Sequence, residues 1–248
     1  DSFYDGGRYN SIDKVNIQIS NLVSNGADII DIGAASSKPG SKLIDPRKEL
    51  DIISDYIIEL SNNFKDIHLS IDTYNSNVAE FALSKGFSII NDISAGRYDS
   101  NIFNIVKDYN AGYVLMHMLG DPETMQENPK YDNVVQSIQL FLKTKIQELQ
   151  DSGFDNTIID PGFGFGKSID DNFKILKDLE SFQSLKRPII VGLSRKSMIY
   201  KTLNITPEES LNGTSALNIL ALERGANILR VHDAKEAFEC INLLKKLN

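Results

Sequence analysis

The sequence predicts an α/β fold, specifically a (β/α)8 TIM barrel, and three observations support this class. Seven short apolar runs each end on a polar or charged residue, and segments of helical length separate them. Runs of β-branched and apolar residues of this kind are typical of buried parallel strands. The length of 248 residues fits the roughly 250 residues typical of such a barrel. We therefore expect one domain over residues 1–248.

Each expected strand closes on a polar residue, and in a (β/α)8 barrel the carboxyl ends of the strands carry the chemistry. In chain order the runs are Ile29-Ile30-Asp31, Leu69-Ser70-Ile71-Asp72, Ile89-Ile90-Asn91-Asp92, Val114-Leu115-Met116-His117, Ile158-Ile159-Asp160, residues 189–196 and Ile228-Leu229-Arg230-Val231-His232-Asp233. The ends of these runs are therefore the candidate site residues.

Eight helices are expected between the runs, because these segments carry start and stop signals. They cover residues 12–24, 46–63, 75–85, 101–108, 133–151, 170–183, 207–224 and 234–247. Asp45 before Pro46 and Thr206 before Pro207 are start signals, since proline suits the first turn and Asp or Thr caps it. The glycines expected to end helices in the left-handed conformation are Gly26, Gly86, Gly153 and Gly225.

Eight helices and seven strands leave a closed barrel one strand short. The first helix follows residues 1–8, a polar, glycine-bearing stretch that is typical of a strand-to-helix connection. A closed barrel with right-handed crossovers needs the eighth strand. We expect that the first strand is missing through truncation at the start of the chain. The alternative is that another segment closes the gap.

Charge and cysteine content exclude several classes of protein. The chain has 34 acidic and 26 basic residues and a formal net charge of −8, whereas nucleic-acid binding needs a basic face. One cysteine, Cys240, allows neither a disulfide framework nor a thiolate metal site. No run approaches the roughly 18 apolar residues of a membrane span, and the first residues show no signal-peptide pattern. We expect a soluble, cytoplasmic protein with no nucleic-acid or membrane partner.

A glycine-rich loop follows the fifth run, over residues 160–167. Gly162, Gly164 and Gly166 allow close approach of the backbone to a ligand, and the loop leads into a helix N-terminus, which favours anions. The spacing is G-x-G-x-G rather than the G-x-G-x-x-G of a dinucleotide fold. The loop therefore fits a closed barrel better than a dinucleotide-binding sheet.

Asp72, Asn91 and Asp160 end three separate runs, and all three should face the same end of the barrel. Carboxylates and amides there suit a planar heterocycle with paired N–H donors, such as the edge of a pterin or a guanine. The alternative is that these side chains only cap helices or satisfy loop amides. Three such residues together at strand ends favour ligand binding.

Cations gather at the last two strand ends, where they can hold a small anion within an acidic protein. Arg195 and Lys196 close the sixth run, and Arg230 and His232 lie at the end of the seventh, where alternation sends both to one side. Two cations and an imidazole can hold a phosphate or pyrophosphate, and a guanidinium can also stack on a ring. A structural salt bridge is the alternative for a single arginine.

The remaining polar residues at the ends of the runs are interpreted as structural. His117 lies between Met116 and Met118, which favours a buried core histidine over a catalytic base, and His68 opens its strand from the opposite end of the barrel. Asp31 is also expected to be mainly structural. Three histidines are too few for a multi-histidine zinc site.

These motifs together resemble the dihydropteroate synthases of the pterin-binding barrel family. The resemblance covers residues 1–236. It includes Asp1-Ser2-Phe3 together with Asp5-Gly6-Gly7; residues 26–33; Ser70-Ile71-Asp72-Thr73-Tyr74; Asn91-Asp92-Ile93-Ser94; Met116-His117-Met118 together with Gly120 and Thr124-Met125-Gln126; residues 160–167; Ser194-Arg195-Lys196; Gly213-Thr214; and Arg230-Val231-His232-Asp233. Nine ordered motifs make this resemblance highly specific.

The resemblance implies a folate-pathway transferase that joins 6-hydroxymethyl-7,8-dihydropterin pyrophosphate to p-aminobenzoate and releases pyrophosphate. It also implies Mg2+, a homodimer through C-terminal helices, and a sulfonamide target. The implied catalytic residues are Asp72, Lys196, Arg230 and His232. The implied pterin-binding residues are Asp72, Asn91, Asp160, Lys196 and Arg230, and the implied pyrophosphate-binding residues are Lys38, Arg230 and His232. The implied p-aminobenzoate-binding residues are Phe3, Ser37, Pro39, Phe165, Lys196 and Ser197.

Three departures from the family pattern stand out. The stretch whose asparagine helps to hold Mg2+ in the family would precede Asp1, so the metal ligands in this chain are unknown. Ala35 stands near the position where the family has Glu or Gln, and Lys38 replaces an arginine, which keeps the charge but loses bidentate contact. Two alternatives therefore stay open, namely a methyltetrahydrofolate methyltransferase of the same family and a non-catalytic pterin-binding paralogue.

Overall fold

The computed structural model describes residues 12–34 and 44–247, and within them it contains seven strands, as the sequence predicts. They are β1 (Ile29–Ile32), β2 (His68–Asp72), β3 (Ile89–Asp92), β4 (Gly112–Met116), β5 (Thr157–Asp160), β6 (Ile190–Val191) and β7 (Ile228–Leu229). Most apolar side chains of β2 to β6 are buried. Parallel strands covered by helices read as continuous apolar runs for this reason.

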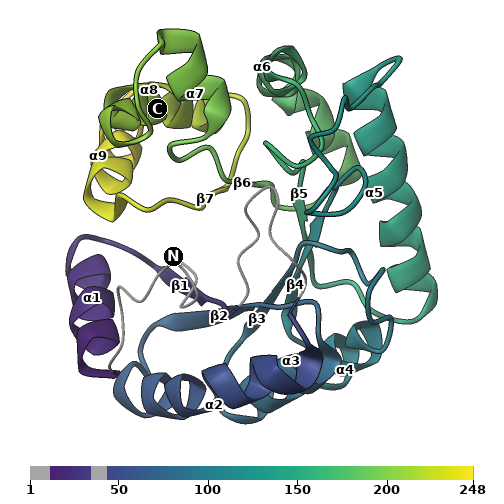
Figure 1. The fold of residues 1–248 in the computed structure, drawn as a ribbon, viewed down its shortest axis with the longest axis vertical. Coiled ribbons are helices and arrows are strands. Elements are labelled where there is room, and N and C mark those ends of the chain that lie inside the picture. The colour runs from purple at the N-terminus through teal and green to yellow at the C-terminus, as the bar shows by residue number, and fades with distance from the viewer. Residues whose placement is uncertain (1–11, 35–43, 248) are drawn as a thin grey trace.

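The strands are all parallel and follow one another in chain order around a curved sheet (Figure 1). Hydrogen bonds join β1 to β5 in sequence and β6 to β7, and a bridge between Ile159 and Ile189 links the two groups. Within the described residues, β1 and β7 do not pair. The opening between them is where the sequence predicts an eighth strand.

The helices lie outside the strands and cover the apolar core (Figure 1). They are α1 (Ile12–Ser24), α2 (Pro46–Asn63), α3 (Ser76–Ser84), α4 (Ile102–Asp108), α5 (Val134–Asp151), α6 (Ile169–Lys177), α7 (Ser197–Leu203), α8 (Leu211–Glu223) and α9 (Ala234–Leu244), with 3₁₀ helices η1 (Leu179–Leu185) and η2 (Glu208–Ser210). The Asp45 side chain caps α2 by accepting from the Arg47 amide. The four predicted helix-ending glycines all have positive φ, which confirms their role.

The structure differs from the expected helices in three places. Helix α7 was not predicted: it begins directly after Lys196, in the stretch between the sixth run and the helix expected over residues 207–224. The helix expected over residues 207–224 begins at Leu211, and η2 precedes it. The helix expected over residues 170–183 divides at Asp178 into α6 and η1.

A cavity of about 460 Å³ lies inside the ring of strands and continues between α1 and α9. Its inner wall is apolar, and its lining includes Ile29, Ile89, Val114, Ile158 and Ile190. Its outer part lies between the facing sides of α1 and α9, on either side of the opening in Figure 1. Within residues 12–34 and 44–247, no helix has both the length and the apolar character that a membrane span needs.

Candidate functional site

The carboxyl ends of the strands bring the predicted polar residues together. Asp72 closes β2 and lies in register with Asn91 of β3, so both side chains point to the same side of the sheet. Asp160 closes β5 beside Met116 of β4. Asn91 and Asp160 are buried, at 7% and 8% exposure.

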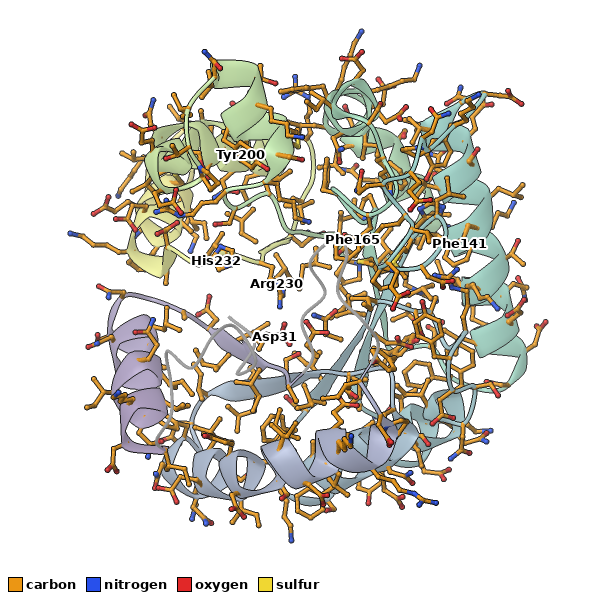
Figure 2. The ribbon with its side chains drawn as sticks, in the orientation of Figure 1. Asp31, Phe141, Phe165, Tyr200, Arg230 and His232 are labelled. Carbon is orange, nitrogen blue, oxygen red and sulfur yellow. The ribbon has the colours of Figure 1, made fainter. Side chains whose placement is uncertain are left out.

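Arg230 follows β7 and reaches across the opening to two carboxylates. Its Nε donates to Asp31 Oδ2 at 2.8 Å, and its Nη2 donates to Asp72 Oδ2 at 3.2 Å. Figure 2 shows Arg230 and Asp31 pointing toward one another inside the ring. Although burial favours the neutral form, the carboxylates of Asp31 and Asp72 raise the pKa of Arg230 above its ordinary value. The guanidinium is therefore a fixed positive charge at the centre of the site.

The carboxyl group of Asp72 has a pKa close to neutral pH. Burial and the neighbouring charge of Asp31 raise its pKa to about 7, against the opposing effect of Arg230. The group changes its charge near neutral pH, which is a property typical of functional carboxyls.

Asp31, which the sequence predicts to be mainly structural, contacts two of the candidate site residues. Its Oδ1 accepts from Ser70 Oγ at 2.7 Å, and its Oδ2 accepts from Asn91 Nδ2 at 3.0 Å and from Arg230. It lines the cavity with Asn91 and Arg230. The run Ile29-Ile30-Asp31 indicated its place at a strand end, but nothing in the sequence showed its partners.

The glycine-rich loop turns back over the end of β5 and is held by Asp160. Asp160 Oδ1 accepts from the amide of Gly162 at 2.7 Å. Burial raises the pKa of Asp160, and the charge of Lys196 opposes this effect. Gly162, Gly164 and Gly166 all have positive φ, so the loop adopts a backbone conformation that glycine favours.

Lys196 extends over this loop from the turn before α7. Its Nζ donates to the carbonyl of Phe163 and lies 4.9 Å from the ring centre of Phe165. Burial lowers its pKa to about 8, and the charge of Asp160 opposes the shift. Lys196 and Phe165 therefore form one wall of the site, and Ser197 begins α7 directly beside them.

Lys167 is a residue that the sequence reasoning left without a role. It is 2% exposed, and its Nζ donates to the carbonyls of Gly162, Phe165 and His117 at 2.8, 2.8 and 3.2 Å. Three acceptors compensate much of the cost of burying a lysine. A lysine ending a G-x-G-x-G loop was the available signal, and its ammonium fixes the shape of the loop.

His232 lies beside Ser194 at the edge of the site. Its Nδ1 is 3.0 Å from Ser194 Oγ, and Figure 2 shows it on the same side of the opening as Arg230. Burial, together with the charge of Arg230, lowers its pKa to about 4. The imidazole is therefore neutral near pH 7 and can donate or accept a hydrogen bond there.

Arg195, unlike Lys196, makes structural contacts. It forms a bidentate ion pair with Asp233 at 2.9 Å for both bonds, and it donates to the carbonyls of Pro207 and Glu208. These contacts tie the turn after β6 to the start of α9 and to η2. Of the two adjacent cations, Lys196 is the one that lies over the glycine-rich loop.

His117 is a buried core histidine, as the sequence predicts. It is 6% exposed, and its ring packs edge-on against Phe141 at 5.1 Å between ring centres. Burial, with the charge of Lys167, lowers its pKa to about 3. Phe3, Ser37, Lys38 and Pro39, to which the resemblance assigns the binding of p-aminobenzoate and pyrophosphate, lie outside the described residues.

A metal ion finds no ready set of ligands in the described part of the chain. Residues 12–34 and 44–247 contain no group of three or more His, Cys, Asp or Glu side chains that could hold one. The nearest carboxylates, Asp31 and Asp72, are paired with Arg230. The described residues alone therefore do not fit a bound metal ion.

Comparison with known proteins adds independent evidence. The family model described as pterin binding enzyme matches residues 1–232. The dihydropteroate synthase of Escherichia coli K12 is 35% identical, and the match covers 99% of this chain and 87% of that protein. The bifunctional dihydropteroate synthase/dihydropteroate reductase of Helicobacter pylori is 37% identical, covering the whole chain and 65% of that longer protein. The crystal structure of Yersinia pestis dihydropteroate synthase with a sulfonamide drug complex superposes with a TM-score of 0.93 at 34% identity, covering all of this chain and 89% of that one.

Proposed function

This chain belongs to the family of pterin-binding enzymes, and from that membership and the strand-end geometry we infer that it acts as a dihydropteroate synthase. The transferase condenses 6-hydroxymethyl-7,8-dihydropterin pyrophosphate with p-aminobenzoate in folate biosynthesis and releases pyrophosphate. The observation that carries this function is the convergence of Asp72, Asn91 and Arg230 on one side, and Asp160 and Lys196 on the other, at the carboxyl ends of the strands.

The pterin is proposed to bind through the buried polar side chains. Asp72, Asn91 and Asp160 offer acceptor oxygens to the amino and ring N–H groups, and Lys196 donates to the carbonyl and a ring nitrogen. Asn91 and Asp160 are largely shielded from water, so an unmatched ligand would leave them without partners. Such a site discriminates strongly against rings that lack the matching donors.

The pyrophosphate is proposed to bind at Arg230 and His232, with Lys38 as a further expected cation. A guanidinium carries five N–H donors, and Arg230 uses its Nε for Asp31 and one Nη2 hydrogen for Asp72. The remaining three donors are available for phosphate oxygens. The neutral imidazole of His232 adds a directed hydrogen bond and gains affinity for a proton as the anion arrives.

The p-aminobenzoate is proposed to bind beside the glycine-rich loop. Phe165 and the stem of Lys196 present an apolar wall, and Ser197 stands at the start of α7 to meet the carboxylate. Phe3, Ser37 and Pro39 are expected to complete this pocket. The sulfonamide complex of the Yersinia pestis enzyme supports a drug site in this family.

The reaction requires more positioning than acid–base catalysis. Departure of pyrophosphate leaves a carbocation on the pterin methylene, which the electron-rich ring delocalises and the carboxylate of Asp72 stabilises electrostatically. Arg230 and His232 stabilise the leaving group. The arylamine is neutral and nucleophilic near pH 7, so its nitrogen attacks the methylene without a strong base and then releases its extra proton to solvent. Holding both substrates in line then supplies much of the rate.

Mg2+ belongs to this proposal only through the family resemblance, because the described residues do not fit a metal ion by themselves. No step above depends on it.

A homodimer is proposed through the C-terminal helices, supported by the exposed apolar side chains of Leu220 on α8 and Phe238 on α9. The single domain over residues 1–248 and the cytoplasmic location stay predictions.

A pyrophosphate-release assay tests the proposed function. The purified protein is supplied with the pterin pyrophosphate and p-aminobenzoate, with and without Mg2+, and pyrophosphate and dihydropteroate are measured. We expect release that depends on both substrates, and the comparison with and without Mg2+ tests the metal that the family resemblance implies. Binding of the pterin pyrophosphate without turnover would instead identify a non-catalytic paralogue. A methyltetrahydrofolate methyltransferase, which the comparisons do not favour, would need neither Ser197 nor the pair Arg230 and His232.

Substitutions at the two ends of the pterin substrate should separate binding from chemistry. Asp160→Ala is expected to raise the KM for the pterin pyrophosphate by at least about 10-fold, because a buried ring donor loses its charged acceptor. His232→Ala is expected mainly to lower kcat, by roughly 10-fold, because it weakens stabilisation of the leaving group. Steady-state kinetics with each substrate varied distinguishes these effects. Equal changes of KM and kcat in both variants would contradict this division of roles.

A further inference from the structure

We propose that Asp31 is a positioning residue that sets the orientation of the Asn91 amide and of the Arg230 guanidinium toward the pterin pyrophosphate. The proposal rests on the proposed function, and it concerns a residue that the family motifs and the charge pattern left as structural. Asp31 would act only through its neighbours, without contacting the reacting atoms.

The contacts of Asp31 connect four strands. Asp31 lies in β1 and receives hydrogen bonds from Ser70 in β2, Asn91 in β3 and Arg230 after β7. Since β1 and β7 do not pair within the described residues, the ion pair of Asp31 with Arg230 is a side-chain link across the open seam of the sheet (Figure 2). The Asp31 side chain is 16% exposed and the Arg230 side chain is 41% exposed, so the carboxylate is shielded from solvent more than the guanidinium is.

The orientation of Asn91 follows from the chemistry of a carboxylate. A carboxylate can only accept hydrogen bonds, so Asp31, which pairs with Arg230, holds the NH2 end of the amide, whose Nδ2 lies 3.0 Å from Asp31 Oδ2. A flipped amide would place two acceptors against each other. The carbonyl oxygen of Asn91 is therefore directed to the ligand, where it selects an N–H group and disfavours a bare ring nitrogen.

The orientation of Arg230 follows from the same oxygen. Asp31 Oδ2 also accepts a hydrogen bond from the Nε of Arg230. The two Nη groups of the guanidinium then remain for Asp72 and for an anion. Asn91 and Arg230, which would contact opposite ends of the pterin substrate, are thus both held by the same oxygen, Asp31 Oδ2. Loss of Asp31 would leave Arg230 with only Asp72, the residue that the ligand also needs.

A double-mutant cycle tests this coupling. Asp31→Ala is compared in the wild-type and the Asn91→Ala background, with KM and kcat measured for both substrates. We expect Asp31→Ala to raise the KM for the pterin pyrophosphate about 10-fold in the wild type and less than about 3-fold in the Asn91→Ala background. The KM for p-aminobenzoate should stay within about 2-fold, since its proposed pocket lies at the other side of the site. An equal fold-change in both backgrounds, or equal changes for both substrates, would overturn the proposal.

Control variants separate positioning from stability. Asp28→Ala removes an aspartate just before the other end of β1, outside the proposed binding residues, and is expected to change neither KM more than about 2-fold. Asp31→Asn keeps one acceptor oxygen, so it should recover part of the KM effect of Asp31→Ala. Thermal unfolding of each variant shows whether it is folded. Recovery of folding by Asp31→Asn without any recovery of KM would contradict a positioning role.

Calorimetric binding of the pterin pyrophosphate, without p-aminobenzoate, keeps the two proposals distinguishable. If the wild type binds it but releases no pyrophosphate in the full assay, the proposed function fails. The double-mutant cycle of Asp31→Ala and Asn91→Ala is then measured as changes in the Kd for the pterin pyrophosphate, with the same expected fold-changes. If the wild type turns over but Asp31→Ala leaves Kd unchanged, the positioning role fails and the function stands. If the wild type does not bind it, both fail.

Discussion

Replacing Asp72 with asparagine is expected to lower kcat/KM for the pterin pyrophosphate by about 100-fold at pH 8, because a charged acceptor is lost at the developing carbocation. The same variant should also change the pH profile. Burial and the charge of Asp31 raise the pKa of Asp72 to about 7 in the ligand-free site. The reactive form of the group is the carboxylate, so activity should fall as the pH drops below about 7 and the carboxylate becomes protonated.

The alkaline side of the profile should depend on Lys196. Burial lowers its pKa to about 8, so the donating ammonium is lost as the pH rises above that value. A bell-shaped dependence of kcat/KM with its maximum between about pH 7 and pH 8 is the expected result, since kcat/KM reports the free enzyme. Lys196→Arg provides a matched variant, because a guanidinium keeps its proton throughout this range.

Measurement of kcat/KM from about pH 6 to about pH 9 in the wild type, Asp72→Asn and Lys196→Arg checks both assignments. Asp72→Asn should move the acid midpoint, and Lys196→Arg should move the alkaline midpoint. Titration of the substrate itself is common to all three proteins and therefore cannot produce a difference between them. An acid limb with the same midpoint in Asp72→Asn would contradict the role given to this carboxyl.

The positions of the strand ends could be predicted from the sequence because they are local. A buried parallel strand is a short apolar run, and the polar residue that ends it must lie at one end of the barrel. The same holds for the helix-ending glycines, where the left-handed conformation excludes most other residues. Asp72, Asn91 and Asp160 were therefore identified together as candidates without knowledge of their contacts.

The network around Asp31 could not be predicted in this way because its contacts are distant in the sequence. Asp31 and Arg230 are 199 positions apart, and an aspartate that ends a strand looks the same whether it caps a loop or pairs with a cation. The contrast between Arg195 and Lys196 has a similar cause. Which of two adjacent cations faces the site depends on a turn where Arg195 has positive φ, a conformation that is uncommon for such a residue.

The backbone of the glycine-rich loop should tolerate no side chain at Gly162. This residue has φ of +72°, and an added Cβ would overlap with the carbonyl oxygen of His117. That carbonyl also accepts from Lys167, so the clash would disturb the ammonium that holds the loop. Gly162→Ala is expected to reduce the free energy of unfolding by about 3 kcal/mol or more, as the sum of backbone strain and a steric overlap.

Gly86→Ala separates these two costs, and the comparison is the decisive part of the experiment. Gly86 also has positive φ, +103°, but an added Cβ would meet no atom within 4 Å. Its expected cost is therefore the backbone term alone, about 1–2 kcal/mol. Urea unfolding and calorimetric pterin binding are measured for both variants. Equal destabilisation of the two variants would show that the backbone at His117 moves away from the added Cβ without a measurable loss of stability. A larger loss in Gly162→Ala, with weakened pterin binding in that variant only, would show that Asp160 needs the rigid turn beside it to face the ligand.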